Sequence, residues 1–239
     1  MSMTAAFENP EVQVVCAPVH FHREKNWLQK FQSLDFSGLM GITGAGIRLG
    51  WPLMANGANL AYRKSAFEMV GGYSGNEHLA SGDDMFLVQK IATYWPGGVR
   101  FLKSLEATVQ TEAAPDLQSF WQQRLRWGTK NAAIPNWPMR LSLLAVFLFC
   151  WSIWLNLAWG IAFAVVGLPA NNLWIFLFQI TIKAVLDYFF LAEMCRFFKR
   201  PDLLRSFLPS FFLHTVYIPI LGTASIFFKK YEWKGRRTR

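Results

Sequence analysis

The sequence has little charge. Only 16% of its 239 residues are Asp, Glu, Lys or Arg, whereas 53% are hydrophobic and 16% are aromatic. In an ordinary soluble domain roughly a quarter of the residues are charged, so this composition argues against one. Acidic residues are especially few, which leaves a net charge of +9. We therefore expect an integral membrane protein, and its basic excess needs an explanation.

A base-reading motif is also lacking, so the basic excess does not indicate nucleic acid. The cations gather at the ends of apolar runs, at Arg196, Lys199 and Arg200 and again in the last ten residues. Lys and Arg in such places anchor helices at the lipid headgroups. We expect membrane lipids as partners and no nucleic acid.

Cysteine is scarce. The three cysteines, Cys16, Cys150 and Cys195, are odd in number and far apart, and two of them fall in apolar runs. This pattern excludes a disulfide framework and a zinc site, and it predicts packed thiols facing a reducing compartment.

The first ten residues contain no apolar core of signal-peptide length and no membrane segment. They predict the end of a helix around 5–7 and a turn at 9–10, followed by a Val-rich strand over 12–17. A glycine-rich stretch over 38–50 is expected to be flexible. It has neither the G-x-G-x-x-G nor the Walker spacing of a phosphate loop.

Residues 21–41 carry Trp27, Phe31 and Leu34 at helical spacing, with a cationic edge. Such a segment suits a helix lying in the membrane interface, or an ordinary surface helix packed on a sheet. The sequence leaves both alternatives open.

Two adjacent carboxylates, Asp83 and Asp84, stand ahead of an apolar run. With Ser81 as the N-cap, both would lie in the first turn of a helix, where the helix dipole stabilises them. That explanation is complete by itself, but one cap residue suffices and adjacent carboxylates repel each other. The pair therefore also predicts a site that deprotonates a hydroxyl, with Asp84 as the general base.

A second cluster follows on an expected helix, with Gln123, Arg124, Arg126 and Trp127. Arg forms paired, charge-assisted hydrogen bonds that suit a pyrophosphate, and Trp offers a flat face for a sugar ring. Helical spacing brings Gln123 and Trp127 to one side. The alternative is a juxtamembrane helix with its Arg and Trp at the headgroups.

Together, and just ahead of a membrane segment, these motifs resemble the membrane-embedded glycosyltransferases of family 2, which include cellulose, chitin and hyaluronan synthases and ceramide glucosyltransferases. That family carries an acidic pair with a Leu three positions on, here Asp84 with Leu87, and a Gln-x-x-Arg-Trp box. The resemblance implies a GT-A-type α/β domain and inverting transfer from a nucleotide-sugar to a lipid-linked or glycan acceptor. Asp83 stands where the family usually has Glu, as a substrate-positioning group.

The family also has a Gly-x-Asn before a short strand, matched by Gly57 and Asn59, and a Gly-Gly-aromatic turn, matched at 71–73. Gly57 would let the backbone approach a sugar closely, with Asn59 as amide donor and acceptor. A tight turn in which Asn59 holds the backbone is the alternative.

In the family, the nucleotide-binding segment and an Asp-x-Asp metal motif precede the strand expected at 12–17, and no such motif stands there here. The resemblance therefore implies an N-terminally truncated chain, in which residues 1–138 form the C-terminal half of the catalytic domain. A divalent cofactor, Mg²⁺ or Mn²⁺, would have its ligands outside this chain, and none is assigned within it. A membrane remnant or scaffold that has lost catalysis is the alternative.

Residues 139–239 are expected to form an α-helical transmembrane region. The uncharged run 141–166 and the run 173–195 are each long enough to cross about 30 Å of hydrocarbon. Lys183 and Asp187, four residues apart in the second run, are expected to neutralise each other.

A third apolar stretch over 203–228 precedes a strongly basic tail. A full span would export that tail, against the positive-inside rule. Pro209 and Pro219 predict a break and hence a re-entrant segment, with a third span as the alternative. The catalytic domain and the tail at 234–239 are then both expected in the cytoplasm.

Overall fold

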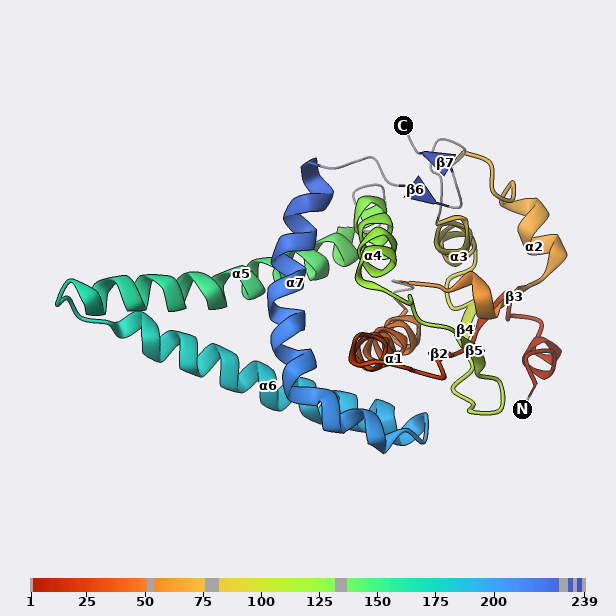
Figure 1. Cartoon of the computed structure of the whole chain (residues 1–239). Helices are drawn as coiled ribbons and strands as arrows, with labels where there is room; N and C mark the ends of the chain where they lie inside the picture. Colours follow the sequence, from red (N-terminus) through yellow and green to blue (C-terminus); the bar gives the residue numbers. More distant parts are fainter. Residues whose placement is uncertain are drawn as a thin grey trace.

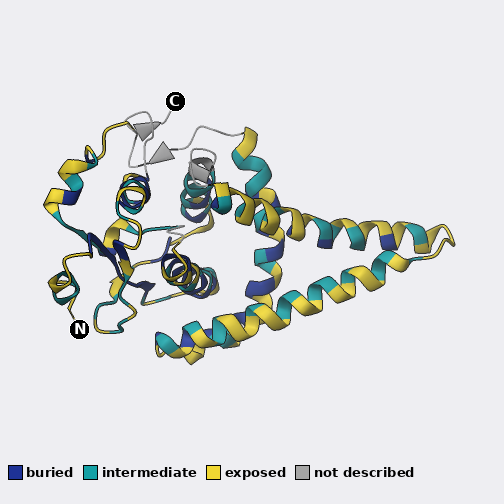
Figure 2. Cartoon of the chain, turned by 180° about the vertical axis from the view of Figure 1, so that it is seen from behind, coloured by how far each residue is buried: buried dark blue, intermediate teal, exposed yellow. Residues whose placement is uncertain are grey.

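The computed structural model describes residues 2–50, 54–75, 82–131 and 137–227, and the two-residue strands at 232–233 and 236–237. An α/β body lies at one end, and a long pair of helices projects from it (Figure 1). The strands at 14–16 and 19–21 are buried, whereas the projecting helices are largely exposed (Figure 2). The expected order, a mixed α/β domain followed by apolar helices, is thus observed.

The strands of the body form two small sheets. β1 (Val14–Cys16) pairs antiparallel with β3 (Leu60–Tyr62) and parallel with β4 (Val99–Phe101). β2 (Val19–Phe21) pairs parallel with β5 (Val109–Thr111). Every residue of β1 and β2 is buried, as expected of Val-rich strands covered on both faces. The shorter helices of the body are η1 (Ala5–Glu8), η2 (Gly57–Asn59), α2 (Lys64–Met69) and α3 (Asp83–Tyr94).

Helix α1 (Trp27–Arg48) is the central element of the fold. Its side chains enter four hydrophobic clusters: Phe31 packs with α4 and α7, Phe36 with β2, Leu34 with α6 and α7, and Ile47 with β1 and α3. Neither expected placement describes it, because α1 is covered by strands on one side and by helices on the others. Its amphipathic pattern therefore marks a buried helix with polar side chains that find partners inside the protein.

Four of the glycines expected to be flexible, Gly38, Gly41, Gly44 and Gly46, instead lie within α1. Their missing side chains allow close contacts: a Cβ at Gly38 would stand 3.1 Å from Leu191, and one at Gly44 would stand 2.9 Å from Phe101. Glycine lowers intrinsic helix stability by roughly 1 kcal/mol relative to alanine, which is why the sequence indicated flexibility. Tertiary packing against α6 and β4 reverses that preference.

The remaining helices run from α4 (Leu117–Asn131) through α5 (Trp137–Val165), α6 (Asn171–Phe197), η3 (Pro201–Ser206) and α7 (Phe207–Phe227). Within the described part of the chain, three helical segments are long and apolar enough to cross a membrane: α5, α6 and Pro201–Phe227. α5 and α6 form the projecting hairpin, and α7 crosses their axes steeply between the hairpin and the body (Figure 1). α7 is thus oriented differently from the other two.

α7 is continuous, so the break expected at Pro209 and Pro219 does not occur. Pro209 lies in the first turn, where its missing N–H has no helical partner to lose. Pro219 would leave the carbonyl of Thr215 without a donor, but the indole Nε1–H of Trp154 on α5 donates to it at 3.0 Å. A side chain from another helix therefore compensates for the proline.

Amide side chains hold the α5–α6 hairpin together. Asn172 donates to Asn156 (2.8 Å), Asn156 donates to Gln179 (3.1 Å), and Gln179 donates to Ser152 (2.9 Å). Such hydrogen bonds join helices where lipid offers no hydrophobic driving force. The ion pair expected between Lys183 and Asp187 is present on α6.

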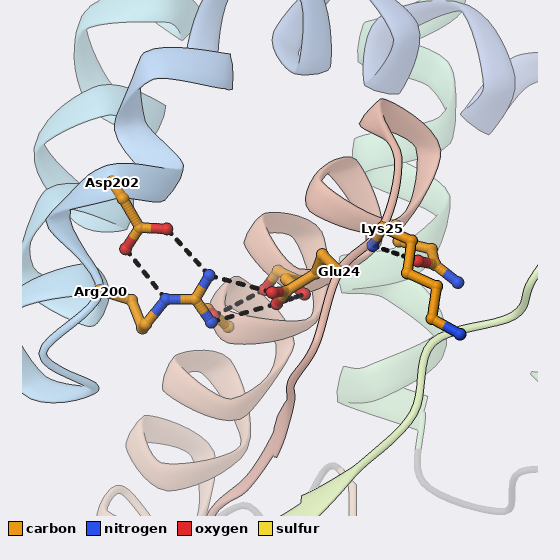
Figure 3. A network of polar contacts seen from close by, with 7 residues as sticks. Glu24, Lys25, Arg200 and Asp202 are labelled. Atoms are coloured by element: carbon orange, nitrogen blue, oxygen red, sulfur yellow. Dashed lines mark hydrogen bonds and ion pairs between the residues drawn. The ribbon is translucent and has the colours of Figure 1, made fainter.

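A second polar network joins the end of α6 to the start of α1 (Figure 3). Arg200 contacts both oxygens of Glu24, each at 3.1 Å, and both oxygens of Asp202, each at 2.9 Å. Burial opposes the charge on Glu24, but hydrogen bonds from Arg200 and Ser33 lower its pKa. This paired fork fixes the membrane hairpin to the body.

Candidate active site

The acidic pair begins helix α3, as the sequence predicted. Gly82 occupies the N-cap position with a φ of 107°, a conformation that favours glycine, and the predicted cap Ser81 lies outside the described residues. Asp83 is exposed and Asp84 is half-buried. The two carboxylates thus face different surroundings, and Asp84 is the one directed into the protein.

Gly57 holds the carboxylate of Asp84. The backbone N–H of Gly57 donates to Oδ2 at 2.7 Å, and that of Met85 donates to Oδ1 at 2.8 Å. A Cβ at Gly57 would stand 3.2 Å from Oδ2 and 3.3 Å from the Cβ of Asp84, so only glycine fits without a shift. The structure therefore brings these two predicted site residues together, although they are far apart in the sequence.

The charge of the acidic pair affects two further groups, the Cys16 thiol and the Tyr73 hydroxyl. Burial, and then the negative charge of Asp84, raise the pKa of the Cys16 thiol to about 12. Tyr73 shares a hydrogen bond with Tyr62, with 3.2 Å between the hydroxyls, and this bond, burial and the nearby carboxylates raise its pKa to about 12. Both groups stay protonated at neutral pH. The Gly-Gly-aromatic motif had indicated Tyr73, whereas no sequence signal indicated Tyr62.

Asn59 has a structural role. Its side chain is buried, and the amide nitrogen donates to the carbonyls of Pro18 and Ala107, each at 2.7 Å. This is the alternative in which Asn59 holds the backbone, and it corrects the prediction that Asn59 is a donor to a sugar. Asn59 instead fixes the loop that carries Gly57.

Arg124 is also committed to the fold. Its side chain is 3% exposed, and its Nη2 lies 2.8 Å from Oδ2 of Asp35 on α1. The two groups form a close ion pair without an aligned hydrogen bond, and Nε of Arg124 has no acceptor among the described residues. The guanidinium of Arg124 therefore faces α1 in this structure, and its contact with a pyrophosphate stays a prediction.

The rest of the predicted box is less buried. The ring of Trp127 lies 4.5 Å from the Arg124 guanidinium and 6.0 Å from the ring of Phe36. Gln123 and Arg126 are partly exposed, and Oε1 of Gln123 has no hydrogen-bond partner among the described residues. Trp127 is thus fixed from the protein side, and polar groups remain on α4 that the fold does not fully use.

The acidic pair and α4 are linked through α5. Met85 and Phe86, directly after the pair, pack against Met139 and Leu143 near the start of α5. No hydrogen bond or ion pair within the described ranges joins Asp84 to Gln123, Arg126 or Trp127. The carboxylates therefore lie at the base of the first membrane helix, and substrate would have to bridge the two motifs.

A metal site is not formed by the described residues, among which no group of three or more His, Cys, Asp or Glu side chains could hold an ion. Asp83 and Asp84 alone do not provide the six or so oxygen ligands that Mg²⁺ requires. Among the described residues, no ligand set therefore fits the divalent ion implied by the family resemblance.

The family model for glycosyl transferase family group 2 matches residues 2–182. The chain belongs to this family. The match includes the acidic pair of this family 2 glycosyltransferase, its α4 helix and α5, so it confirms membership of family 2 and the α/β fold class followed by helices apolar enough to span a membrane. No curated protein and no solved structure matches the chain. Membership implies a nucleotide-sugar donor and an acceptor.

Proposed function

We propose that the chain forms the acceptor-side half of an inverting glycosyltransferase, in which Asp84 is the general base. The observation that carries this proposal is the position of the Asp84 carboxylate, held 2.7 Å from the Gly57 N–H at the base of the first membrane helix. Each carboxylate oxygen accepts one backbone N–H, so lone pairs remain for the hydroxyl of a substrate. A fixed base that can still accept a proton is what acceptor activation needs.

In the proposed reaction the acceptor hydroxyl oxygen attacks the anomeric carbon of the sugar. The bond from that carbon to the donor phosphate breaks, and the nucleoside diphosphate leaves with the bonding electron pair. Asp84 takes the hydroxyl proton. Attack opposite to the leaving group inverts the configuration at the anomeric carbon.

The other groups have supporting roles in this proposal. Arg126 would stabilise the charge of the leaving diphosphate, where a guanidinium contributes most. Trp127, with Gln123 one turn away, would provide a flat face and an amide for the acceptor. Exposed Asp83 would position the substrate. The acceptor would be lipid-linked or a growing polysaccharide, since the site lies beside the membrane helices.

We further propose that the donor pocket and the metal ligands come from residues outside these 239, because no described cluster fits a metal and the sequence has no Asp-x-Asp motif. No reaction step is therefore assigned to a metal here. The purified 239-residue chain should not turn over any labelled nucleotide-sugar. Turnover by that chain alone would contradict this part of the proposal.

The orientation of α7 supports a cytoplasmic site. If α5 and α6 cross the bilayer, α7 lies along the membrane plane, because it crosses them steeply (Figure 1). One face of α7 presents apolar side chains at four-residue spacing to the outside, and 33% of its most apolar segment is buried, against 11% for α5 and 6% for α6. The exposed stripe consists of Leu208, Phe212, Val216 and Ile220. In this proposal the exposed stripe faces lipid, while the opposite face of α7 packs on the body and the hairpin.

The length of the hairpin agrees with this placement. From Trp154, which contacts α7, to the end of α5 at Val165, the helix rises by roughly 17 Å. The diameter of α7 adds about 10 Å, so the two together nearly cover the ~30 Å of hydrocarbon. The basic tail then stays on the side of the body, in accordance with the positive-inside rule.

Cysteine labelling in intact cells tests this topology. Leu168→Cys at the exposed tip of the hairpin should react with a membrane-impermeant thiol reagent, whereas Lys199→Cys and Thr238→Cys should react only after permeabilisation. Thr238 lies outside the described residues, so the labelling tests the side of the tail directly. Rapid labelling of Thr238→Cys in intact cells would mean that α7 crosses the bilayer.

The general base is tested by Asp84→Asn, introduced into the chromosomal gene and assayed in isolated membranes with labelled nucleotide-sugars. Asn keeps the shape and capping ability but cannot take the proton, so transfer should fall by about 10² to 10⁴-fold. Asp83→Asn is the matched control on the same turn, and it should lower transfer much less. Near-normal transfer by Asp84→Asn would favour a membrane scaffold without catalysis.

A further inference from the structure

A buried carboxylate lies where the catalytic body meets the membrane helices. Asp35 on α1 is 7% exposed, and side chains from two other helices surround it. Arg124 on α4 lies 2.8 Å away, the hydroxyl of Tyr217 on α7 donates to both carboxylate oxygens at 3.4 Å, and Nε2 of His214 lies 3.8 Å away. One charge thus joins three helices.

On the side of the body, this charge is linked to the proposed acceptor face. Among the described residues, Asp35 is the only acidic side chain that forms an ion pair with Arg124. The guanidinium in turn lies over the rings of Phe120, at 5.1 Å, and Trp127, at 4.5 Å. Because α4 carries both arginine and tryptophan, the pairing with Asp35 sets how α4 is rotated about its axis. That rotation decides where Trp127, Gln123 and Arg126 point.

On the membrane side, the same charge is linked to the hairpin through α7. The ammonium of Lys183 on α6 lies 5.4 Å from the ring centre of Phe211, and Trp154 on α5 is bonded to Thr215. Asp35 therefore sits between a helix held by the bilayer and a helix that faces the substrate.

We propose that Asp35 is a positioning residue for the acceptor site. Resting on the function proposed above, this inference holds that Asp35, through Arg124, fixes α4 relative to α7 so that Trp127 and Gln123 face the acceptor. Asp35 itself touches no reacting atom. Its loss should displace the acceptor and leave access of water to the donor unchanged.

The test uses the ratio of donor hydrolysed to donor transferred, measured in isolated membranes with sugar-labelled UDP-glucose, UDP-N-acetylglucosamine and GDP-mannose. This ratio does not depend on how much folded chain is present, so a merely structural role would not change it. Asp35→Asn should raise the ratio about tenfold, and Asp35→Glu, which keeps the charge, should restore most of the transfer. Glu24→Gln is the matched control, because it weakens a second carboxylate–arginine pair of the junction, Glu24 with Arg200, without touching α4 (Figure 3).

Tyr217→Phe is a second variant for the case that Asp35→Asn leaves too little folded chain. It removes only the Tyr217 hydroxyl that donates to the Asp35 carboxylate. It should raise the ratio roughly threefold. The positioning role alone would be overturned if Asp35→Asn and Tyr217→Phe both showed the normal ratio of hydrolysis to transfer, while Asp84→Asn lost transfer in the same assay. Unchanged transfer in Asp84→Asn would overturn the proposed function, and this inference with it.

Discussion

The start of α3 and the middle of α4 are the two motif regions of this chain, and the fold uses them differently. At the start of α3, backbone N–H groups fix Asp84, and its carboxylate stays partly open to substrate. In α4, Arg124 is enclosed and paired with Asp35, while Arg126, two residues on, is partly exposed. Residues two apart on a helix face different sides. A motif gives residue types, and helix rotation decides which of them reach a substrate.

The largest effect on stability is expected when the enclosed Arg124 is replaced. Arg124→Met keeps the length of the side chain but leaves Asp35 as a buried charge without its arginine, which should cost about 3–5 kcal/mol. Arg126→Met is the matched control, and its free energy of unfolding should change by less than about 1 kcal/mol. Thermal unfolding in detergent measures both. Equal losses in the two variants would contradict the distinction between them.

Removal of the aromatic face should have a smaller effect. Trp127→Ala should lower transfer roughly tenfold, because the lost stacking contributes about 1.4 kcal/mol. Hydrolysis of the donor by water should stay largely intact. Trp127→Phe should recover part of the transfer because it keeps a ring. Transfer and hydrolysis falling together would instead indicate that Trp127 acts only in packing with Phe36.

On the α3 side, Gly57→Ala provides the sharper test of geometry. The new Cβ would meet the Asp84 carboxylate at 3.2 Å and displace it by a few tenths of an ångström. We expect transfer to fall roughly three- to tenfold, with little change in thermal stability. Ala58→Gly, one residue on, should leave transfer close to normal.

The smallest expected effect is a loss of stability at acidic pH. It should arise at His20, close to the cluster that contains Trp127 of α4, and not at α3. His20 lies on β2, whose neighbours pack in the same cluster as Trp127, and burial together with the charge of Arg200 lowers its pKa to about 4. In the unfolded chain the histidine takes up its proton near pH 6.5. The contribution of neutral His20 to the free energy of unfolding is therefore complete above that pH and is lost as the pH falls toward 4. In His20→Gln, the loss in the free energy of unfolding between pH 7 and 4.5 should be smaller by about 1–2 kcal/mol. An unchanged dependence between pH 7 and 4.5 would contradict this assignment.

Much of the fold followed from the sequence because its signals are local. The Val-rich strand, the acidic helix start and the two long apolar runs were all placed correctly, since composition and capping determine them. The glycines of α1 and the prolines of α7 were misjudged. In both helices a distant partner, Leu191 for Gly38 and Trp154 for the carbonyl freed by Pro219, reverses the local preference.

The candidate site divides in the same way. Gly57 and Asp84 were predicted and are brought together by the hydrogen bond from the Gly57 N–H to the Asp84 carboxylate. Asn59 and Arg124 were assigned to substrate, yet their partners Pro18, Ala107 and Asp35 are remote in the sequence. Asp35 itself was missed. A lone carboxylate within an otherwise apolar helical pattern was the available signal.

The bond from Trp154 to the carbonyl of Thr215 has one further consequence. That carbonyl is free only because Pro219 lacks an N–H, so sliding α7 by a turn would present an oxygen already bonded within the helix. The crossing of α5 and α7 therefore has a single register. Hairpins tilt to match the thickness of their bilayer, and here any tilt is passed on to α7 and so to α1. If α5 and α6 cross a bilayer, a change in its thickness would therefore be expected to shift α7 and α1 together.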